Sequence, residues 1–176
     1  MRAGKDYIGP PALKEQLFDS PEVIARIWRG YPFTRKMVIS AEDTLNPGGL
    51  PLEFKWVVLR GDPSAIDIRP LGDNASRAEI TFTYPFRHDQ TGVNEIWSNR
   101  FDVGVFAVTP KSVSVPGFIT WMGLDHEELR YDDKHDLVSI DYNTGRFVDP
   151  RIGVIHPFRE ILKWQDGKLV SKQKIV

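Results

Sequence analysis

The sequence contains no cysteine, which excludes disulfide bonds, thiolate nucleophiles and cysteine-ligated zinc sites. It also lacks an excess of charge, because 23 basic and 24 acidic residues leave a formal net charge of −1 at pH 7. A chain with so little net charge creates no overall field that would attract nucleic acid or an anionic membrane. No apolar run approaches the roughly 20 residues of a membrane-spanning helix. We therefore expect no nucleic-acid partner and no membrane span.

The common catalytic motifs are missing as well. There is no G-x-S-x-G nucleophile elbow, no G-x-x-x-x-G-K-[ST] phosphate loop and no G-x-G-x-x-G turn. The four histidines stand far apart and show none of the short spacings of zinc ligands. The sequence does not exclude a pair of acidic residues that hydrolyses glycosides, because two carboxylates can meet in the fold from any positions in the sequence. The sequence therefore favours a protein that is not an enzyme.

The composition is that of a globular protein, with 41% hydrophobic and 27% charged residues in a chain of 176. This length suits one domain of ordinary size with an appendage. The N-terminal stretch "MRAGKDYIGPPALKEQL" has no apolar core of a signal peptide. Two origins stay open: a cytoplasmic protein, or a piece of a longer exported chain whose location would be extracytoplasmic, either periplasmic or secreted.

Apolar and polar residues alternate with a period of two along most of the chain between residues 33 and 124. The alternation is clearest in "RKMVISA", "LEFKWVVLR", "SRAEITFTYP" and "NRFDVGVFAVTP". Turn-forming residues separate these runs at 46–49, 61–63, 72–74, 89–92 and 109–111. Six or seven short strands separated by such turns predict an antiparallel β-sandwich of about 90 residues.

The two ends of the chain carry different patterns. In residues 1–32 an extended leader precedes apolar residues at roughly helical spacing, which residues 19–22 interrupt. We therefore expect a short helix followed by a second helix, which Ser20 caps and which runs from Pro21 to about Trp28. In residues 125–176 we expect a hairpin of strands 129–131 and 137–142, a short helix over 158–164, a turn at 166–167 and a terminal strand. The predicted architecture is a mostly β protein with an N-terminal helical segment and a C-terminal extension of hairpin and helix.

The stretch "DTLNPGGLPLEFKW" joins an Asn-Pro-x-Gly turn to a strand of the form Leu-x-aromatic-x-Trp. It resembles the corresponding segment of polycystic-kidney-disease-type (PKD) and related immunoglobulin-like domains. The runs "VVLRGDPSAIDIRPLGDNASRAEITFTYP" and "SNRFDVGVFAVTPKSVSVPGFITW" resemble immunoglobulin-like modules of large exported bacterial proteins, notably planctomycete proteins of unknown function. The resemblance covers residues 37–142. The positions that match the PKD-type segment are Asp43, Asn46, Pro47, Gly48, Leu52, Phe54 and Trp56.

This resemblance implies a non-catalytic accessory module in a multidomain protein. Such a module spaces neighbouring domains of its parent chain, or binds polysaccharide or another protein. For ligand binding the candidate residues are Trp97, Trp121 and Tyr131, because aromatic faces stack on sugar rings and these residues lie near expected strand ends. Trp97, in the polar loop "VNEIWSNR", is the strongest of the three, and packing in the core is the alternative for all of them.

Two further hypotheses stay open. Asp43 and Asn46 could donate oxygen ligands to a calcium ion that stabilises the fold, although calcium needs six to eight such ligands and the spacing differs from known calcium loops. No other cofactor is expected. Alternatively, the chain is a small hydrolase with a site between the sandwich and the C-terminal extension. Its candidate groups are His126, Asp132, His135 and Asp141.

Overall fold

The computed structural model describes residues 1–3, 15–89, 97–142 and 156–176. These residues form two compact units. The first comprises residues 1–30 and 34–122, and the second comprises residues 31–33 and 123–176. Residues 4–14, which include most of the expected leader and the start of the expected helical stretch, lie outside the described residues.

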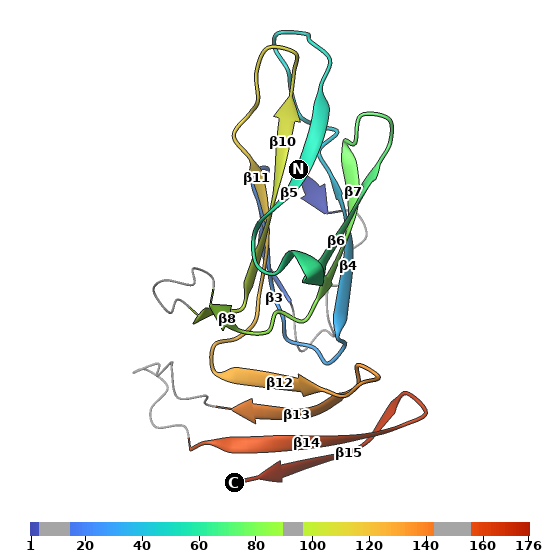
Figure 1. Ribbon diagram of the computed structural model, residues 1–176, viewed down its shortest axis with the longest axis vertical. Coiled ribbons are helices and arrows are strands. Elements are labelled where there is room, and N and C mark those ends of the chain that lie inside the picture. The colour runs from blue at the N-terminus through green and yellow to red at the C-terminus, as the bar shows by residue number, and fades with distance from the viewer. Residues whose placement is uncertain (4–14, 90–96, 143–155) are drawn as a thin grey trace. The chain divides into compact units, whose positions relative to one another are not determined.

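Two large β-sheets form most of the first unit (Figure 1). The four-stranded sheet is antiparallel, with the strand order β1 (Arg2–Ala3), β4 (Thr34–Ser40), β7 (Arg77–Thr83) and β6 (Ile66–Leu71). The five-stranded sheet has the order β2 (Gln16–Asp19), β3 (Val23–Ile27), β11 (Gly117–Met122), β10 (Arg100–Val108) and β5 (Glu53–Arg60). Its strands are antiparallel except for the parallel pair β3 and β11. The 3₁₀-helix η1 (Pro63–Ala65) leads from β5 to β6, and β8 (His88–Asp89) pairs with β9 (Trp97–Ser98).

The core lies between these two sheets. Strands β7, β10 and β11 turn alternate side chains inward, so Ile80 and Phe82 of one sheet and Val103 and Ile119 of the other are completely buried. The ring of Phe82 lies 5.9 Å from that of Trp121 of the facing sheet. The two sheets therefore pack face to face, which confirms the predicted mostly β, antiparallel sandwich in its general form.

The predicted N-terminal helix is wrong. Residues 23–27 form β3, which lies between β2 and β11 inside the five-stranded sheet. Apolar residues of a central strand can be buried on both faces, and a short run of this kind fits helical spacing equally well. The hydroxyl of Ser20 accepts hydrogen bonds from the amides of Glu22 and Val23, so it caps a turn before a strand. Strands of the N-terminal segment are thus part of the sandwich.

The second unit contains one antiparallel sheet with the order β12 (Glu127–Tyr131), β13 (Leu137–Tyr142), β14 (Phe158–Gln165) and β15 (Lys168–Ile175). The predicted hairpin appears as β12 and β13, and the predicted terminal strand appears as β15. The predicted helix over 158–164 is wrong, because these residues form β14. Asp166 and Gly167 both adopt positive φ angles and close a tight turn, which pairs β14 with β15 and favours a strand over a helix.

Gly61 directly follows β5, at a place where a side chain does not fit. Its φ angle is +97°, and an added Cβ would lie 2.1 Å from Cδ1 of the buried Phe101. Replacing Gly61 with alanine should therefore lower the free energy of unfolding by about 2–4 kcal/mol, through backbone strain together with displacement of Phe101. Urea denaturation measures this loss.

The matched control for this prediction is Gly72→Ala. Gly72 has a φ angle of +80°, but nothing lies within 4 Å of an added Cβ. This variant isolates the backbone strain, and a loss of about 1–2 kcal/mol is expected. Equal decreases in the free energy of unfolding of the two variants would contradict a contribution from the contact with Phe101.

Candidate functional site

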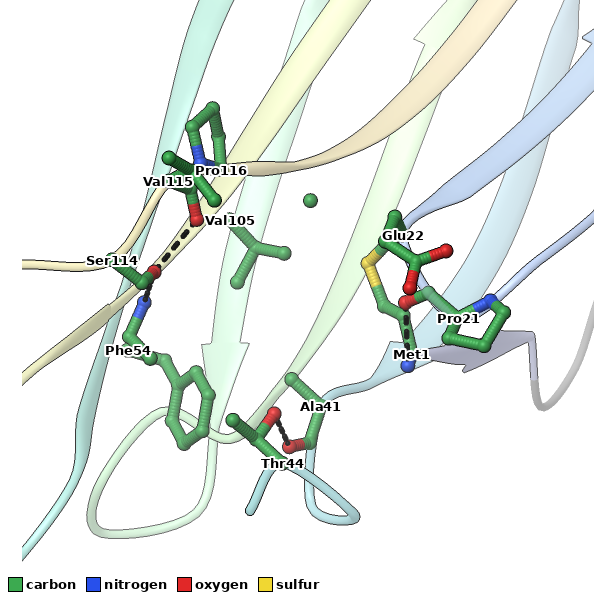
Figure 2. A pocket seen from close by; sticks show the side chains of 12 residues that line it. Met1, Pro21, Glu22, Ala41, Thr44, Phe54, Val105, Ser114, Val115 and Pro116 are labelled. Atoms are coloured by element: carbon green, nitrogen blue, oxygen red, sulfur yellow. Dashed lines mark hydrogen bonds between the residues drawn. The ribbon is translucent and has the colours of Figure 1, made fainter. Parts of the chain in front are cut away.

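A pocket of about 200 Å³ opens at one end of the sandwich (Figure 2). Residues of both sheets line it. Ala41 follows β4, Phe54 lies on β5 and Val105 lies on β10, and these apolar side chains are buried. Met1 and Glu22 lie on one side of the pocket in Figure 2, across from the segment that precedes β11. The arrangement suits a small apolar group rather than a large polar ligand.

The hydroxyl groups at this pocket are already engaged. Ser114 Oγ donates to the carbonyl oxygen of Val115 at 2.7 Å and accepts from the amide of Ala107 at 2.9 Å. Thr44 Oγ1 donates to the carbonyl oxygen of Ala41 at 2.7 Å. These bonds hold loops in place, and neither hydroxyl pairs with a basic side chain that would activate it as a nucleophile. The only ionisable side chain among the lining residues is that of Glu22.

A second feature of the first unit is the solvent-facing side of its five-stranded sheet. We define the outer apolar face by residues from four of its strands: Phe18, Val57, Leu59, Phe106 and Phe118. Phe18, Val57, Leu59 and Phe118 are each 36–48% exposed. At the centre of the face is Gly104, where an added Cβ would lie 2.6 Å from Leu59 and 3.2 Å from Phe106. The side chains of Leu59 and Phe106 therefore lie over the backbone of Gly104.

A charged cluster lies on the same side of this sheet. The carboxylate of Asp102 accepts hydrogen bonds from Thr120 Oγ1 at 2.6 Å and from Arg100 Nε at 2.8 Å. Arg60 Nε lies 3.8 Å from the other oxygen of Asp102. Asp102 is buried, while both arginine side chains are about half exposed. One carboxylate against two guanidinium groups leaves a local charge of about +1.

The other sheet differs on its solvent-facing side. There Glu79 pairs with Lys36 at 3.2 Å and with Arg69 at 3.5 Å across the strands β4, β7 and β6. Charged pairs of this kind are the usual covering of a solvated sheet face. The outer apolar face is thus a property of one sheet only.

The three predicted ligand-binding aromatics lie in different surroundings. Trp121 is completely buried, and its Nε1 donates to Met37 Sδ at 3.3 Å within the core. This corrects the expectation that its ring is open to a ligand. Trp97 lies on β9 and is 45% exposed. Tyr131 lies on β12, where its partly buried ring packs edge-on against Phe33 at 5.0 Å.

The two predicted calcium ligands have other partners. Asn46 Oδ1 accepts a hydrogen bond from the amide of Gly48 at 3.1 Å, and its Nδ2 donates to the carbonyl oxygen of Leu50 at 2.5 Å. Asn46 thus shapes its own turn. Asp43 is exposed and lies 3.5 Å from Arg2 Nε. Within the described ranges, no group of three or more acidic or histidine side chains could hold a metal ion.

The two histidines proposed for a hydrolase make local contacts. His126 Nε2 lies 3.4 Å from Glu127 Oε1, beside it in the sequence. The ring of His135 stacks on that of Phe33 with centroids 4.1 Å apart. His135 also has a φ angle of +63°, as a turn residue does. Both contacts are typical of surface and turn positions.

The two aspartates proposed for the same site are also engaged locally. Asp132 Oδ1 accepts hydrogen bonds from the amides of Lys134 and Asp136, which closes the turn between β12 and β13. Asp141, on β13, pairs with Arg130 of β12 and with Arg159 of β14. The pairing with Asp141 raises the pKa of Arg159. Asp141 therefore links three strands of the second unit.

A polar cluster in the second unit was not predicted from the sequence. Glu160 Oε2 accepts hydrogen bonds from Tyr142 OH at 2.9 Å and from Lys172 Nζ at 2.7 Å. Lys172 Nζ also lies 3.4 Å from Tyr31 OH. Burial, followed by the bond to Glu160, raises the pKa of Tyr142. Burial lowers the pKa of Lys172, but its bonds to Glu160 and Tyr31 outweigh burial, so its pKa lies above the ordinary value.

This cluster had a detectable signal in the sequence. In "FREILKWQ" the alternation places Glu160 on the same face as Phe158 and Leu162. A carboxylate on an apolar stripe needs a partner, because burying it alone is costly. The partners Tyr142 and Lys172 come from neighbouring strands and follow only from the strand register.

No protein-family model matches this chain, nor does any curated protein or solved structure with which it was compared. Over the described part of the chain, no helix is long and apolar enough to cross a membrane.

Proposed function

We propose that this chain is a non-catalytic docking module of a larger exported bacterial protein, and that a neighbouring folded domain packs against the outer apolar face. The observation that carries the proposal is the contrast between the two sheets. One presents Val57, Leu59 and Phe118 to solvent, and the other presents charged pairs. Exposed apolar groups that gather on one face are characteristic of interaction sites.

The form of the surface suggests the kind of partner. The face is part of a β-sheet and draws side chains from four strands, which suits another folded surface better than a single extended peptide. Arg60 and Arg100 lie on the same side of the sheet, with one positive charge in excess. A carboxylate of the partner would complement this charge and set the orientation of the two domains.

The resemblance of residues 37–142 to immunoglobulin-like and PKD-like modules supports the same proposal, because such modules space and orient domains in exported multidomain proteins. The alternative of polysaccharide binding has one specific observation in its favour, the exposed ring of Trp97. The outer apolar face offers a broader surface, so docking is the function that we favour.

Hydroxyl-radical footprinting tests the docking proposal. The purified 176-residue chain is compared with the same residues in their native context, either the full-length parent protein or intact cells that make it. We expect Leu59 and Phe118 to be oxidised in the purified chain and at least fivefold less in the native context. Leu45, which is 89% exposed in the loop between β4 and β5, should be oxidised equally in both.

A variant makes the test specific. Leu59→Glu should restore oxidation of Phe118 in the native context, because a carboxylate opposes burial of this face. The matched control is Val38→Glu on the outward side of β4, which should leave the protection of Phe118 unchanged. Equal oxidation of Phe118 in the purified chain and in the native context would contradict the proposal.

A further inference from the structure

The last strand of the second unit has an open edge. β15 lies at the end of its sheet and pairs on one side with β14. None of the other described strands pairs with its second side. All eight residues of β15 are exposed. Half of its backbone N–H and C=O groups therefore point toward solvent along an edge of roughly 26 Å.

Three lysines and one bulge are the features of this edge that discourage pairing with a second strand of the same kind. Residues 168–175 contain no proline and no glycine. The one irregularity in the pairing of β14 with β15 leaves Val170 of β15 without an opposite residue, because Lys163 pairs with Ser171 and Trp164 pairs with Leu169. Leu169, Val170 and Ile175 offer exposed apolar side chains along the strand. The part of β15 from Ser171 to Ile175, which pairs regularly with β14, is suited to accept an added strand.

The charge of the hairpin formed by β14 and β15 indicates which strand it would accept. Residues 158–175 include five basic and two acidic residues, a local net charge of +3 in a chain whose net charge is −1. Of these, Lys172 is paired with Glu160, and the Lys174 ammonium lies 3.9 Å from the ring centre of Phe158. Among the described residues, no acidic side chain lies within ion-pair distance of Lys163 or Lys168.

We propose that β15 is a binding edge for an extended acidic segment of a partner protein, which adds to this sheet as a fifth strand. Backbone hydrogen bonds to β15 would supply affinity, and the lysines would select glutamate or aspartate side chains. A second copy of the chain fits poorly, because pairing two copies of β15 would bring their lysines together. This edge belongs to a different unit from the outer apolar face, so the proposal stands or fails independently of the docking function.

The test uses a fluorescein-labelled peptide, acetyl-ETEVETEV-amide, and fluorescence anisotropy with the full chain. We expect saturable binding that weakens as salt concentration rises, because surface charge attraction is screened. The lysine peptide acetyl-KTKVKTKV-amide should bind at least tenfold more weakly. An acidic peptide with every second amide N-methylated should also bind at least tenfold more weakly, because it cannot form all the backbone hydrogen bonds to β15.

Variants of the chain locate the site. The double variant Lys168→Glu/Lys174→Glu should weaken binding of the acidic peptide at least tenfold, while its thermal unfolding stays close to that of the wild type. The control Lys111→Glu/Lys134→Glu makes the same change in net charge at exposed loop positions and should alter binding less than threefold. Hydrogen exchange of β15 amides should slow when the peptide is bound.

Three outcomes would overturn the proposal. The first is the absence of binding at millimolar peptide. The second is equal binding by the Lys168→Glu/Lys174→Glu variant or by the N-methylated peptide, which would indicate charge attraction without strand addition. The third is a dimer in sedimentation velocity that this variant abolishes, which would assign the edge to a second copy of the chain.

Discussion

Replacing Glu15 with alanine should lower the free energy of unfolding by about 3–5 kcal/mol, because it leaves a guanidinium group buried without its partner. Glu15 and Arg35 are both completely buried. Arg35 donates from Nε and from Nη2 to the two carboxylate oxygens of Glu15, each at 2.8 Å. This bidentate geometry makes the pair strong once formed and costly to break.

The surroundings of the Glu15–Arg35 pair add to the expected loss of stability. Glu15 Oε1 also accepts hydrogen bonds from the amides of Arg29 at 2.8 Å and Gly30 at 2.9 Å. The guanidinium of Arg35 lies 4.3 Å from the ring centre of Trp28, an arrangement that stabilises a desolvated cation. Without Glu15, two backbone amides and one cation lose their acceptor together.

Urea denaturation of three variants tests this prediction. Glu15→Ala should show the full decrease in the free energy of unfolding. The double variant Glu15→Leu/Arg35→Met should show a smaller decrease, because it removes both buried charges. Glu79→Ala is the control, since its ion pairs with Lys36 and Arg69 reach solvent and should contribute less than about 1 kcal/mol. A loss near 1 kcal/mol for Glu15→Ala would mean that water replaces the missing carboxylate.

This pair shows what a single sequence does not predict. Glu15 lies before β2 and Arg35 lies in β4, and nothing in their spacing indicates that they meet. A buried ion pair follows from the path of the chain between the strands. The alternating strands could be predicted because each buries one side, as in β7, where Ala78, Ile80 and Phe82 are all completely buried.

The errors at β3 and β14 have a common physical cause. Each is a short segment in which the apolar residues do not alternate cleanly, so a helical period and a strand period fit equally well. Strand pairing explains why both segments are strands. β3 pairs with β2 and β11, and β14 pairs with β13 and β15. Such partners are distant in sequence and lie beyond the reach of a local pattern.

Strand β11 explains why Trp121 was expected at a surface. Alternation divides β11 into one side with Phe118 and another with Trp121, and both sides carry a large aromatic ring. The sequence therefore predicts the strand without saying which side faces the core. In the structure Trp121 packs inward and Phe118 stays partly exposed, so the same ambiguity concealed the outer apolar face.

The second large effect is expected at Trp121. Replacing it with alanine should lower the free energy of unfolding by about 3–5 kcal/mol, because the vacated space is enclosed by the sheets and cannot collapse fully. The ring of Trp121 lies 5.4 Å from that of Trp28 and 5.9 Å from that of Phe82, so several aromatic contacts are lost at once. Trp121→Phe should lower the free energy of unfolding less, since phenylalanine keeps most of the buried apolar area.

Trp97→Ala is the comparison that separates a structural role from a binding role. Because Trp97 is 45% exposed on a two-residue strand, its replacement should change the free energy of unfolding by less than about 1 kcal/mol. Both variants are measured by urea denaturation and by retention on an array of soluble and insoluble polysaccharides. Retention of the wild-type chain on a glycan that Trp97→Ala abolishes, with stability unchanged, would favour polysaccharide binding over docking. Loss of retention in Trp121→Ala alone would follow from unfolding, because a ring enclosed in the core cannot touch a sugar.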